Sequence, residues 1–553
     1  MGKFYDEIPE YVMAMIKKQH MFWVATAPLS ADGHVNISSK GVEGTFHIID
    51  SHTVWYEDLS GSGVETISHL RENGRITILF NAFEGPPSIV RLFGCGNFYE
   101  FGTSEYNAFI PPETRHPGSR AVIMIDVHKV GTSCGYAVPF YEFRSHRTRL
   151  LETAAKCELA DIEAEEADNA TISQPPRPDD GLKQYWIQHN VQSIDGLPGM
   201  AFGQHSMDKF QTRGKVYKKD VESVSIKSFL EQLDMRFILG FSLGVTATAA
   251  SNLLFYDQFL LSGRSAWHAM SGLRTRPFLI GTLRRYHHHH LSSRTTMGKF
   301  YDEIPRYVMA MIQKQHMFWV ATAPLSADGH INVSSKGVEG TFHIVDSHTV
   351  WYEDLSGSGV ETISHLRENG RITILFNAFE GPPSIVRLFG RGKFYEFGTP
   401  EYNALIRPET RHPGSRAVIM IDVHKVGPSC GYAVPFYEFK SHRTRLLEFA
   451  AKRELADIEA EEADSAVCEP PRTGNGLKQY WVQESTQSID GLPGMAFGQH
   501  STDKFQTRGK VFKKDDESVS MKGFLEQLDA RFILGFSLGV AATAASNFLF
   551  YRR

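Results

Sequence analysis

The amino-acid sequence starts over after its first half. The nonapeptide MGKFYDEIP at Met1 reappears at Met297, and the two copies then continue in register almost to the end of the chain. From there to Asn97 and Lys393 they differ only at Glu10/Arg306, Lys17/Gln313, Val35/Ile331, Ile37/Val333, Ile49/Val345, Cys95/Arg391 and Asn97/Lys393. Most of these exchanges conserve volume or polarity, so the sequence predicts two units of one fold.

The composition excludes several classes of protein. With 553 residues and 42% apolar content, the chain can bury more than one core. Its five cysteines are odd in number and show no CxxC spacing, which favours a reducing compartment over a disulfide framework and predicts no thiolate metal site. The net charge of -5 argues against a nucleic-acid-binding surface. Acidic Asp6 and Glu7 near the start do not resemble a secretory signal.

The sequence of each unit predicts mainly β structure. Acidic residues and Pro9 predict a short first helix, and Glu65 to Glu72 predicts a second helix that ends at Asn73-Gly74. Because regular βα alternation is absent, the short strands favour a closed antiparallel barrel. The expected strands are Phe22 to Ala27, His34 to Ser39, Thr45 to Ile49, Thr53 to Asp58, Arg75 to Asn81, Ser88 to Tyr99 and Ala121 to Val130. From Ser145 to Asp168 the pattern is helical and acidic, which indicates a solvated helix face.

A Ser/Gly loop gives the strongest local signal for a binding site. The segment Asp58 to Thr66, DLSGSGVET, lies between a predicted strand and a predicted helix and is repeated at Asp354 to Thr362. Free N–H groups and hydroxyls at a helix start form a phosphate cradle, although such loops are more often simple helix caps. Lys40 at a strand end brings a cation, while Arg91, within an apolar strand, either faces solvent or is held by an anion.

Several ordered motifs resemble the flavin-binding split barrel of pyridoxamine-5'-phosphate-oxidase-like proteins. They are VNISSK, VWYEDLSGSGVET, RITILFNAFEGPPSIVRLFG and TSCGYAVPFYEF, and the later GLKQYW and SIDGLPG are similar to one uncharacterised branch of that family. The resemblance covers about residues 10 to 200 and again about 306 to 495. It implies a homodimeric six-stranded barrel with FMN at the subunit interface.

The resemblance also implies a set of cofactor-binding residues. Two departures stand out: Ser62-Gly63 replace an Arg-Lys pair of the true oxidases, and Ile89 replaces a glutamine that contacts the flavin. The family's C-terminal substrate motif is also absent, so pyridoxamine phosphate is not the expected substrate. The predicted FMN contacts are Val35, Asn36, Ile37, Ser38, Ser39, Lys40, Tyr56, Glu57, Ser60, Ser62, Gly63, Thr66 and Arg91 in the first copy, and Ser334, Ser335, Lys336, Tyr352, Glu353, Ser356, Ser358, Gly359, Thr362 and Arg387 in the second.

No residue stands out as catalytic, because in flavoproteins the cofactor carries the redox chemistry. His20, His34, His47, His52 and His69 lack metal-binding or paired spacing and indicate surface or hydrogen-bonded structural histidines. Cys134 and its counterpart Cys430 lie in a small apolar setting that predicts a buried thiol.

The two tails are candidates for membrane insertion. Residues 237–256 and 532–551 carry no charge, and about 20 helical residues span a bilayer core. Gly240 and Gly244 stand at GxxxG spacing. A buried or interfacial helix is the alternative, favoured by the Ser, Thr and Asn residues within the segment. The first reading predicts a protein that faces the cytosol and is anchored by its C-terminal tail.

The predicted organisation is a tandem one. The domains are a split barrel at 1–150, an extension at 151–236, the tail at 237–256, a linker at 257–296, a second barrel at 297–446, its extension at 447–531 and the second tail at 532–551. If the first tail spans the membrane, the second barrel begins on the opposite side of the membrane from the first, and nothing in the linker is long and apolar enough to cross back. One hypothesis is therefore that two adjacent genes have been joined in one predicted product. The barrels then pair as a homodimer, or within the chain as a pseudo-dimer.

Two functions remain open at this point. One is an FMN-binding oxidoreductase acting on a small molecule, which Lys40 and the Ser/Gly loop favour. The other is a non-catalytic split-barrel protein that carries or senses a planar cofactor or serves for dimerisation, which Ser62-Gly63 and Ile89 favour.

Overall fold

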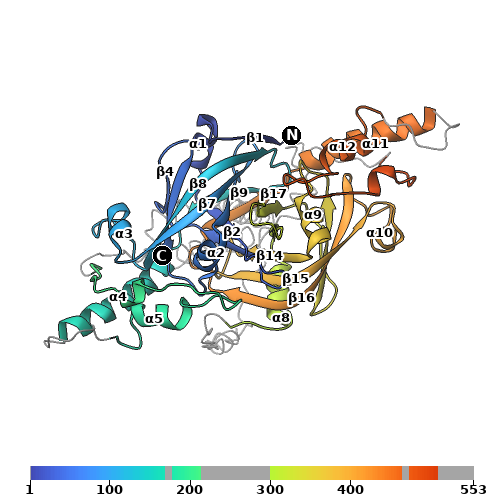
Figure 1. The fold of residues 1–553 in the computed structure, drawn as a ribbon. Helices are drawn as coiled ribbons and strands as arrows, with labels where there is room; N and C mark the ends of the chain where they lie inside the picture. The colour runs from blue at the N-terminus through green and yellow to red at the C-terminus, as the bar shows by residue number, and fades with distance from the viewer. Residues whose placement is uncertain (1, 168–176, 213–298, 464–472, 508–553) are drawn as a thin grey trace, which may run out of the picture. The chain divides into compact units, whose positions relative to one another are not determined.

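The computed structural model describes residues 2–167, 177–212, 299–463 and 473–507 (Figure 1). All of them belong to one compact unit. The predicted membrane segments 237–256 and 532–551 and the linker 257–296 lie outside the described residues. Within the described ranges, no helix has both the length and the apolar character needed to cross a membrane.

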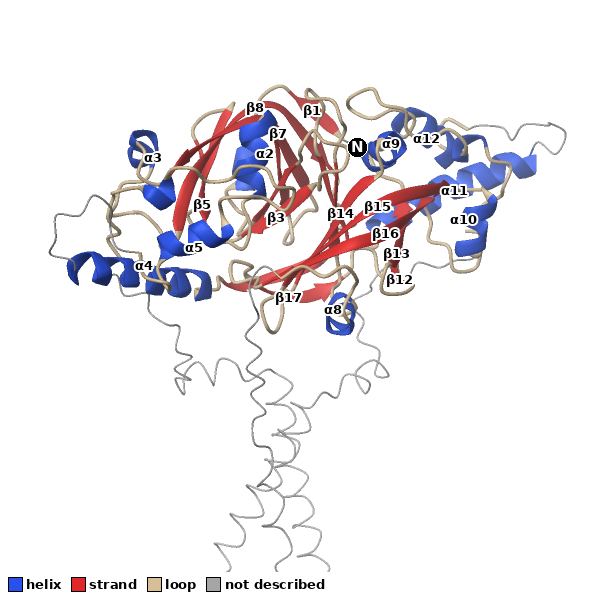
Figure 2. Ribbon diagram, turned by 60° about the horizontal axis from the view of Figure 1, so that its bottom comes forward, coloured by secondary structure: helices blue, strands red, loops and turns tan. Residues whose placement is uncertain are grey.

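The first copy forms a curled antiparallel sheet with the strand order β3-β2-β6-β7-β8-β5-β4, and β1 pairs with β8. The strands are β1 (Lys3–Tyr5), β2 (Phe22–Thr26), β3 (Asn36–Lys40), β4 (Phe46–Ile48), β5 (Thr53–Leu59), β6 (Arg75–Asn81), β7 (Ile89–Glu100) and β8 (Ser119–Ser133). The helices are α1 (Glu10–Ile16), α2 (Glu65–Asn73) and α3 (Ser104–Phe109). Helix α2 packs against β2, β6 and β7 (Figure 2).

The second copy repeats this sheet in the order β11-β10-β14-β15-β16-β13-β12. The register is the same, since Phe22 pairs with Lys40 and Phe318 pairs with Lys336. Its strands are β10 (Phe318–Thr322), β11 (Asn332–Lys336), β12 (Phe342–Ile344), β13 (Thr349–Leu355), β14 (Arg371–Asn377), β15 (Ile385–Glu396) and β16 (Ser415–Ser429). Its helices are α8 (Arg306–Ile312), α9 (Glu361–Glu368) and α10 (Pro400–Leu405). Two tandem antiparallel half-barrel sheets therefore fit the split-barrel prediction.

Strand β2 shows why these residues form both a barrel and an interface. Phe22 and Val24 lie in the core of the first barrel, whereas Trp23 and Ala25 lie in a cluster shared with the second copy. Side chains alternate across a strand, so an entirely apolar strand buries both faces. Trp23 stacks on Trp319 of the second copy with ring centroids 4.5 Å apart. The apolar strand thus faces its own barrel on one side and the other copy on the other.

Backbone pairing and buried arginines also join the two copies. Strand β9 (Phe140–Ser145) pairs with β17 (Phe436–Ser441), an element that the sequence did not predict. Arg75 Nη1 donates to the carbonyl oxygens of Pro324 and Ser326 in the second copy, at 3.0 and 2.7 Å. A buried guanidinium requires such acceptors, so these contacts fix how the two sheets meet.

A helical extension follows each barrel. In the first copy it contains α4 (Arg149–Ala167), α5 (Leu182–His189) and the short turn η1 (Gly203–His205); in the second it contains α11 (Arg445–Ala463), α12 (Leu477–Glu484) and η2 (Gly498–His500). Helix α4 is less solvated than expected. Glu158 is fully buried and paired with Arg115 at 2.7 Å, while Glu163 and Glu166 remain exposed. The extension is therefore packed against its barrel.

Candidate functional site

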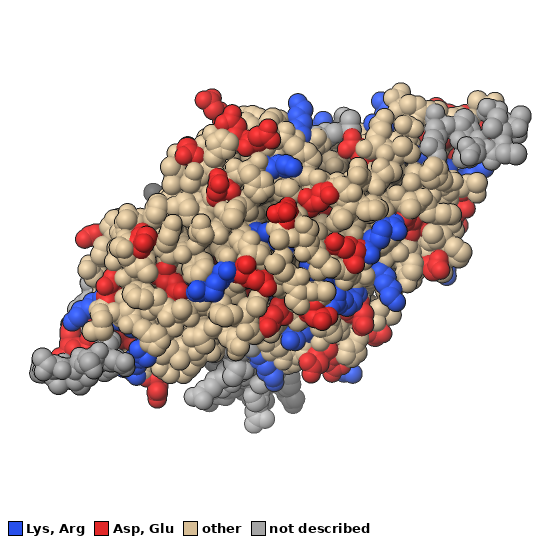
Figure 3. Space-filling view, viewed as in Figure 1, with Lys and Arg blue, Asp and Glu red and all other residues tan. Residues whose placement is uncertain are grey.

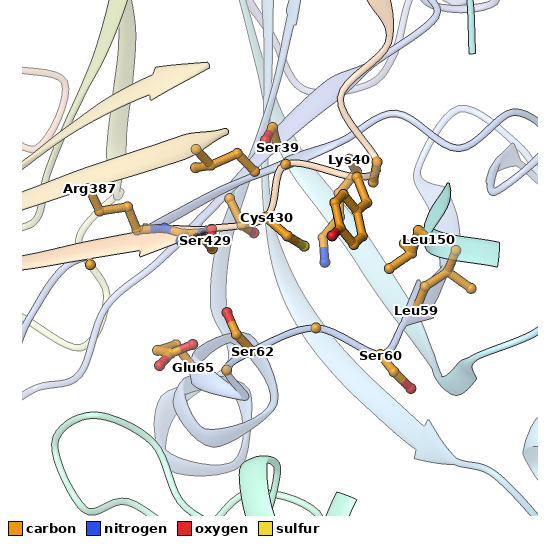
Figure 4. Close-up of a pocket in the computed structure, with 18 of the residues that line it drawn as sticks. Ser39, Lys40, Leu59, Ser60, Ser62, Glu65, Leu150, Arg387, Ser429 and Cys430 are labelled. Atoms are coloured by element: carbon orange, nitrogen blue, oxygen red, sulfur yellow. Dashed lines mark hydrogen bonds between the residues drawn. The ribbon is translucent and has the colours of Figure 1, made fainter. Parts of the chain in front are cut away.

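Two equivalent pockets lie where the copies meet. The first has a volume of about 150 Å³ and the second a volume of about 160 Å³. The first is lined by the end of β3, the Ser/Gly loop before α2 and part of β8, together with β15 and the segment 427–433 of the second copy (Figure 4). The second pocket exchanges the roles of the two copies. Both copies therefore contribute walls to each of these two pockets.

Strand β3 forms one wall of the first pocket. Ser38 and Lys40 line it, and the Ser38 hydroxyl oxygen is buried without a hydrogen-bond partner. Ser39 donates to Asn377 Oδ1 of the second copy at 3.2 Å. Buried hydroxyls normally find a partner, so the orphan hydroxyl of Ser38 marks a place where a ligand or water would donate or accept.

Lys40 is already part of an ion-pair network. Its Nζ lies 2.6 Å from Asp58 Oδ1, and Arg120 Nε lies 2.9 Å from Asp58 Oδ2. Burial acts to raise the pKa of Asp58, but Arg120 and Lys40 outweigh it and the pKa is lowered. Arg120 was not among the predicted site residues, because it lies in an apolar strand that is remote in sequence from Lys40 and the Ser/Gly loop. The network carries one net positive charge beside the Ser/Gly loop.

The Ser/Gly loop is held from outside the barrel. Ser60 Oγ donates to Gly118 O at 2.7 Å and accepts from Trp186 Nε1 at 2.6 Å. Trp186 belongs to the GLKQYW motif, so that motif positions the loop. Ser62 also lines the pocket and has no hydrogen bond to any described residue, so its hydroxyl is available to a ligand.

The opposite wall comes from the second copy. Arg387 Nε donates to Ile37 O at 2.6 Å, and its Nη1 lies 3.5 Å from Ser429 Oγ. Figure 4 shows Arg387, Ser429 and Cys430 entering the pocket from a different side than Lys40 and the loop. Burial raises the pKa of the Cys430 thiol. The sequence did not indicate the segment 427–433 as part of a site.

Arg91 contacts the second copy. It was predicted either to face solvent or to be held by an anion, and it was named among the cofactor contacts. Instead its Nε donates to Val333 O of the second copy at 2.6 Å, and it lines the second pocket together with Lys336. The pleat of β7 points this side chain across the interface, which the sequence pattern of one copy does not reveal.

The structure brings most of the predicted contacts to the pockets but leaves some elsewhere. Val35 and Ile37 lie in the cluster shared between the copies, and Tyr56 and Tyr352 are buried in the barrel cores. Those that line the first pocket are Asn36, Ser38, Ser39, Lys40, Glu57, Ser60, Ser62, Gly63, Thr66 and Arg387. Those that line the second are Ser334, Ser335, Lys336, Glu353, Ser356, Ser358, Gly359, Thr362 and Arg91. Their contact with a cofactor stays a prediction.

His34 and His69 are hydrogen-bonded within the protein. His34 Nδ1 lies 2.5 Å from Asp195 Oδ1, and its Nε2 lies 3.0 Å from His424 Nε2 of the second copy. Asp195 belongs to the SIDG motif, which therefore orients an interface histidine. His69 is fully buried beside Thr26, and burial lowers its pKa to about 3. Among the residues that the structure describes, no three His, Cys, Asp or Glu side chains are grouped for a metal ion.

Charge on the surface is mixed. On the face seen in Figure 3, basic and acidic side chains are interspersed. This face offers no continuous basic surface for a nucleic acid.

Comparison with known proteins gives consistent matches. The family described as Pyridoxamine 5'-phosphate oxidase matches residues 304–430. The Pyridoxamine 5'-phosphate oxidase family protein ustO of Aspergillus flavus is 34% identical over 211 residues, covering 36% of this chain and 78% of that protein. Among solved structures, HupZ of Group A Streptococcus is 25% identical to this chain. The match spans 22% of this chain and 91% of the HupZ chain, with a TM-score of 0.19. An FMN-binding protein of Syntrophomonas wolfei is 14% identical, and the match spans 21% of this chain and 80% of that protein, with a TM-score of 0.17.

Two antiparallel half-barrels that share paired interface pockets are the architecture of a split barrel. The similarity to the Aspergillus flavus protein over most of its length shows that the chain belongs to the pyridoxamine 5'-phosphate oxidase family.

Proposed function

We propose that the chain is an FMN-binding flavoprotein that holds one flavin in each of its two pockets and acts as an oxidoreductase on a small molecule. The composite pocket carries this proposal. It offers the orphan hydroxyl of Ser38, the free hydroxyl of Ser62 and the guanidinium of Arg387 to one ligand. A riboflavin-derived nucleotide presents ribityl hydroxyls and a phosphate that can use these groups.

The residues present fit a flavin in chemical type. Arg387 Nη2 makes no hydrogen bond to the described protein, so the guanidinium keeps donors for a ligand oxygen. When bound, the flavin would supply the electron transfer. The chain would supply the polar contacts, the apolar wall around Ile385 and a half-closed space.

The direct test uses the full-length chain. We expect the purified protein to be yellow, to release FMN on denaturation and to contain two flavins per chain. Changing both Arg387 and Arg91 to Met should weaken FMN binding about tenfold to a hundredfold, the range for losing a charge-assisted hydrogen bond. Arg306→Met serves as the matched control, since Arg306 is exposed and outside both pockets. A colourless protein with no calorimetric response to FMN would overturn the proposal.

A second candidate is a non-catalytic cofactor-binding or dimerisation protein. The ion pair of Lys40 with Asp58 favours it, because the charge expected to hold a phosphate is already partly neutralised. Steady-state oxidation of reduced nicotinamide separates the two. Turnover by the flavin-loaded chain supports the oxidoreductase, and bound flavin without turnover across a panel of acceptors supports the carrier.

A further inference from the structure

A carboxylate lies at the point where the Ser/Gly loop enters α2. Glu65 lines the first pocket, and its side chain folds back over Gly63. A Cβ built on Gly63 would lie only 2.2 Å from Glu65 Oε2 and 2.8 Å from Oε1. The second copy repeats this arrangement, with Glu361 Oε2 at 2.3 Å from a Cβ built on Gly359. In this conformation the carboxylate therefore occupies the space that a Cβ at this position would need.

This carboxylate has no partner within the described residues. Glu65 forms no ion pair or hydrogen bond with them. The guanidinium of Arg387 from the second copy lines the same pocket and is an opposing charge that feels this carboxylate, but the two make no ion pair. Burial lowers the pKa of Arg387, and the carboxylate of Glu65 acts against that shift. The two charges thus face one another across the ligand space.

The same arrangement exists in the second pocket. Burial lowers the pKa of Arg91, and Glu361 of the second copy opposes the shift. Each pocket therefore places a carboxylate at the start of the helix that follows its glycine loop, opposite an arginine on a strand of the other copy. An anionic group at the loop meets repulsion from the carboxylate, whereas a hydroxyl can donate to it.

We infer that Glu65 and Glu361 determine the charge selectivity of the two pockets, disfavouring a phosphate at the Ser/Gly loop relative to an uncharged hydroxyl-bearing group. This inference rests on the proposed flavin binding. It means that the pockets favour FMN over riboflavin less strongly than they would if Glu65 and Glu361 carried no charge. The two glutamates would act by charge on the end of a ligand that lies at the loop.

The test compares FMN with riboflavin, each titrated calorimetrically into the full-length chain. In the double variant Glu65→Gln and Glu361→Gln, we expect FMN to bind about tenfold more tightly, since a neighbouring like charge is removed from a half-buried site. Riboflavin affinity should change less than about twofold, because riboflavin carries no charge there. Each single variant should give two classes of FMN site, one tight and one unchanged.

Two further variants keep the result interpretable. Glu105→Gln with Glu401→Gln is the matched control, because these glutamates also lie in the first turn of a helix but outside both pockets. Gly63→Ala with Gly359→Ala should displace the carboxylates without removing their charge, because the atoms that a Cβ meets are the far ends of flexible side chains. This variant should strengthen FMN binding by a smaller factor.

The outcomes separate the inference from the proposed function. The inference is supported if the glutamine variant binds FMN more tightly than the unchanged chain. It is also supported if the glutamine variant binds FMN and the unchanged chain does not. If the unchanged chain binds FMN and neither variant binds it more tightly, the inference is wrong and the proposed function stands. If neither flavin binds to any of the proteins, both are overturned.

Discussion

The two Ser/Gly loops have identical sequences, but the chain anchors them differently. In the first copy, Asn190 donates to Gly61 O at 3.1 Å, and Arg120 donates to Gly63 O at 2.9 Å. Both bonds act on the loop backbone, so the extension and the barrel hold it together.

In the second copy the same positions make other contacts. There Arg416 donates to Ser485 Oγ at 3.0 Å. Ser485 occupies the position of Asn190, and its shorter side chain does not extend to the loop. Substitutions in the more divergent extension thus alter how an unchanged binding loop is held, and the two pockets need not bind equally.

The shared core should be the part where the copies do not differ. Trp23 and Trp319 are fully buried and stack on each other, so Trp23→Ala and Trp319→Ala should each lower the free energy of unfolding by about 3 to 5 kcal/mol. The double variant should lose less than the sum, because the two rings share one contact. Urea unfolding followed by circular dichroism measures this. Two single variants that differ by several kcal/mol would break the equivalence of the copies.

Removal of Arg120 or Arg416 should have the next largest effect. Arg120→Met leaves the buried Asp58 with Lys40 alone and should cost about 3 kcal/mol. We expect Arg416→Met to cost a similar amount, because each arginine makes one further hydrogen bond, Arg120 to Gly63 O and Arg416 to Ser485 Oγ. Since the folded pKa of Asp58 is lowered, its contribution is present above an unfolded pKa of about 4 and is lost as the pH falls through the folded value. A large loss of stability in only one of the two variants would contradict this equivalence.

Acid should destabilise both copies through one buried histidine each. Burial lowers the pKa of His69 and of His365 to about 3, so both remain neutral in the folded chain. The unfolded chain takes up these protons below about pH 6.5, so stability falls as the pH drops from 6.5 towards 3. Each histidine should remove about 2 kcal/mol between pH 7 and pH 5.

Denaturant unfolding at several pH values, with the His69→Gln and His365→Gln variants, tests this prediction. Each variant should flatten the pH dependence by about half of the part that the two histidines contribute. A slope that neither variant alters would show that other groups cause the acid sensitivity.

The smallest expected difference comes from a surface substitution. Arg391 donates to Ala31 O at 2.8 Å and pairs with Asp32 at 3.2 Å, both in the first copy, whereas Cys95 occupies this position in the first copy. Asp32 is almost fully exposed, so Arg391→Cys should cost about 1 kcal/mol or less. Cys95→Arg should stabilise by a similar amount, because Asp328 stands at the matching turn of the second copy. Thermal unfolding detects both changes, and a destabilised Cys95→Arg chain would show that the two turns are not equivalent.

Local sequence patterns predicted much of the sheet. Arg75–Asn81 has the bounds that its apolar run and flanking Asn73-Gly74 indicate, and Thr53–Leu59 extends the expected strand by one residue. Strand β9 escaped prediction because its pairing partner lies in the other copy. An edge strand of this kind is stabilised by a contact far away along the chain, and no local pattern reports it.

The candidate site divides in the same way. The Ser/Gly loop and Lys40 stood out because small residues and a cation flank a helix start. Arg120 did not stand out, because it borders a stretch typical of an ordinary strand, and Cys430 was noticed only as a buried thiol. Arg91 was named as a cofactor contact, but the sequence did not indicate that its side chain reaches the other copy.

The sequence by itself determined that one split-barrel unit occurs twice and that each carries a hydroxyl-rich loop before a helix. Repetition and residue periodicity depend only on order along the chain, so they can be read without coordinates. Only the tertiary structure decided that each pocket takes a wall from both copies, that Asp58 pairs with both Lys40 and Arg120, and that Glu65 and Arg387 line the same pocket. Those relations depend on distances between residues that are remote in sequence, and charge interactions follow distance and burial rather than sequence order.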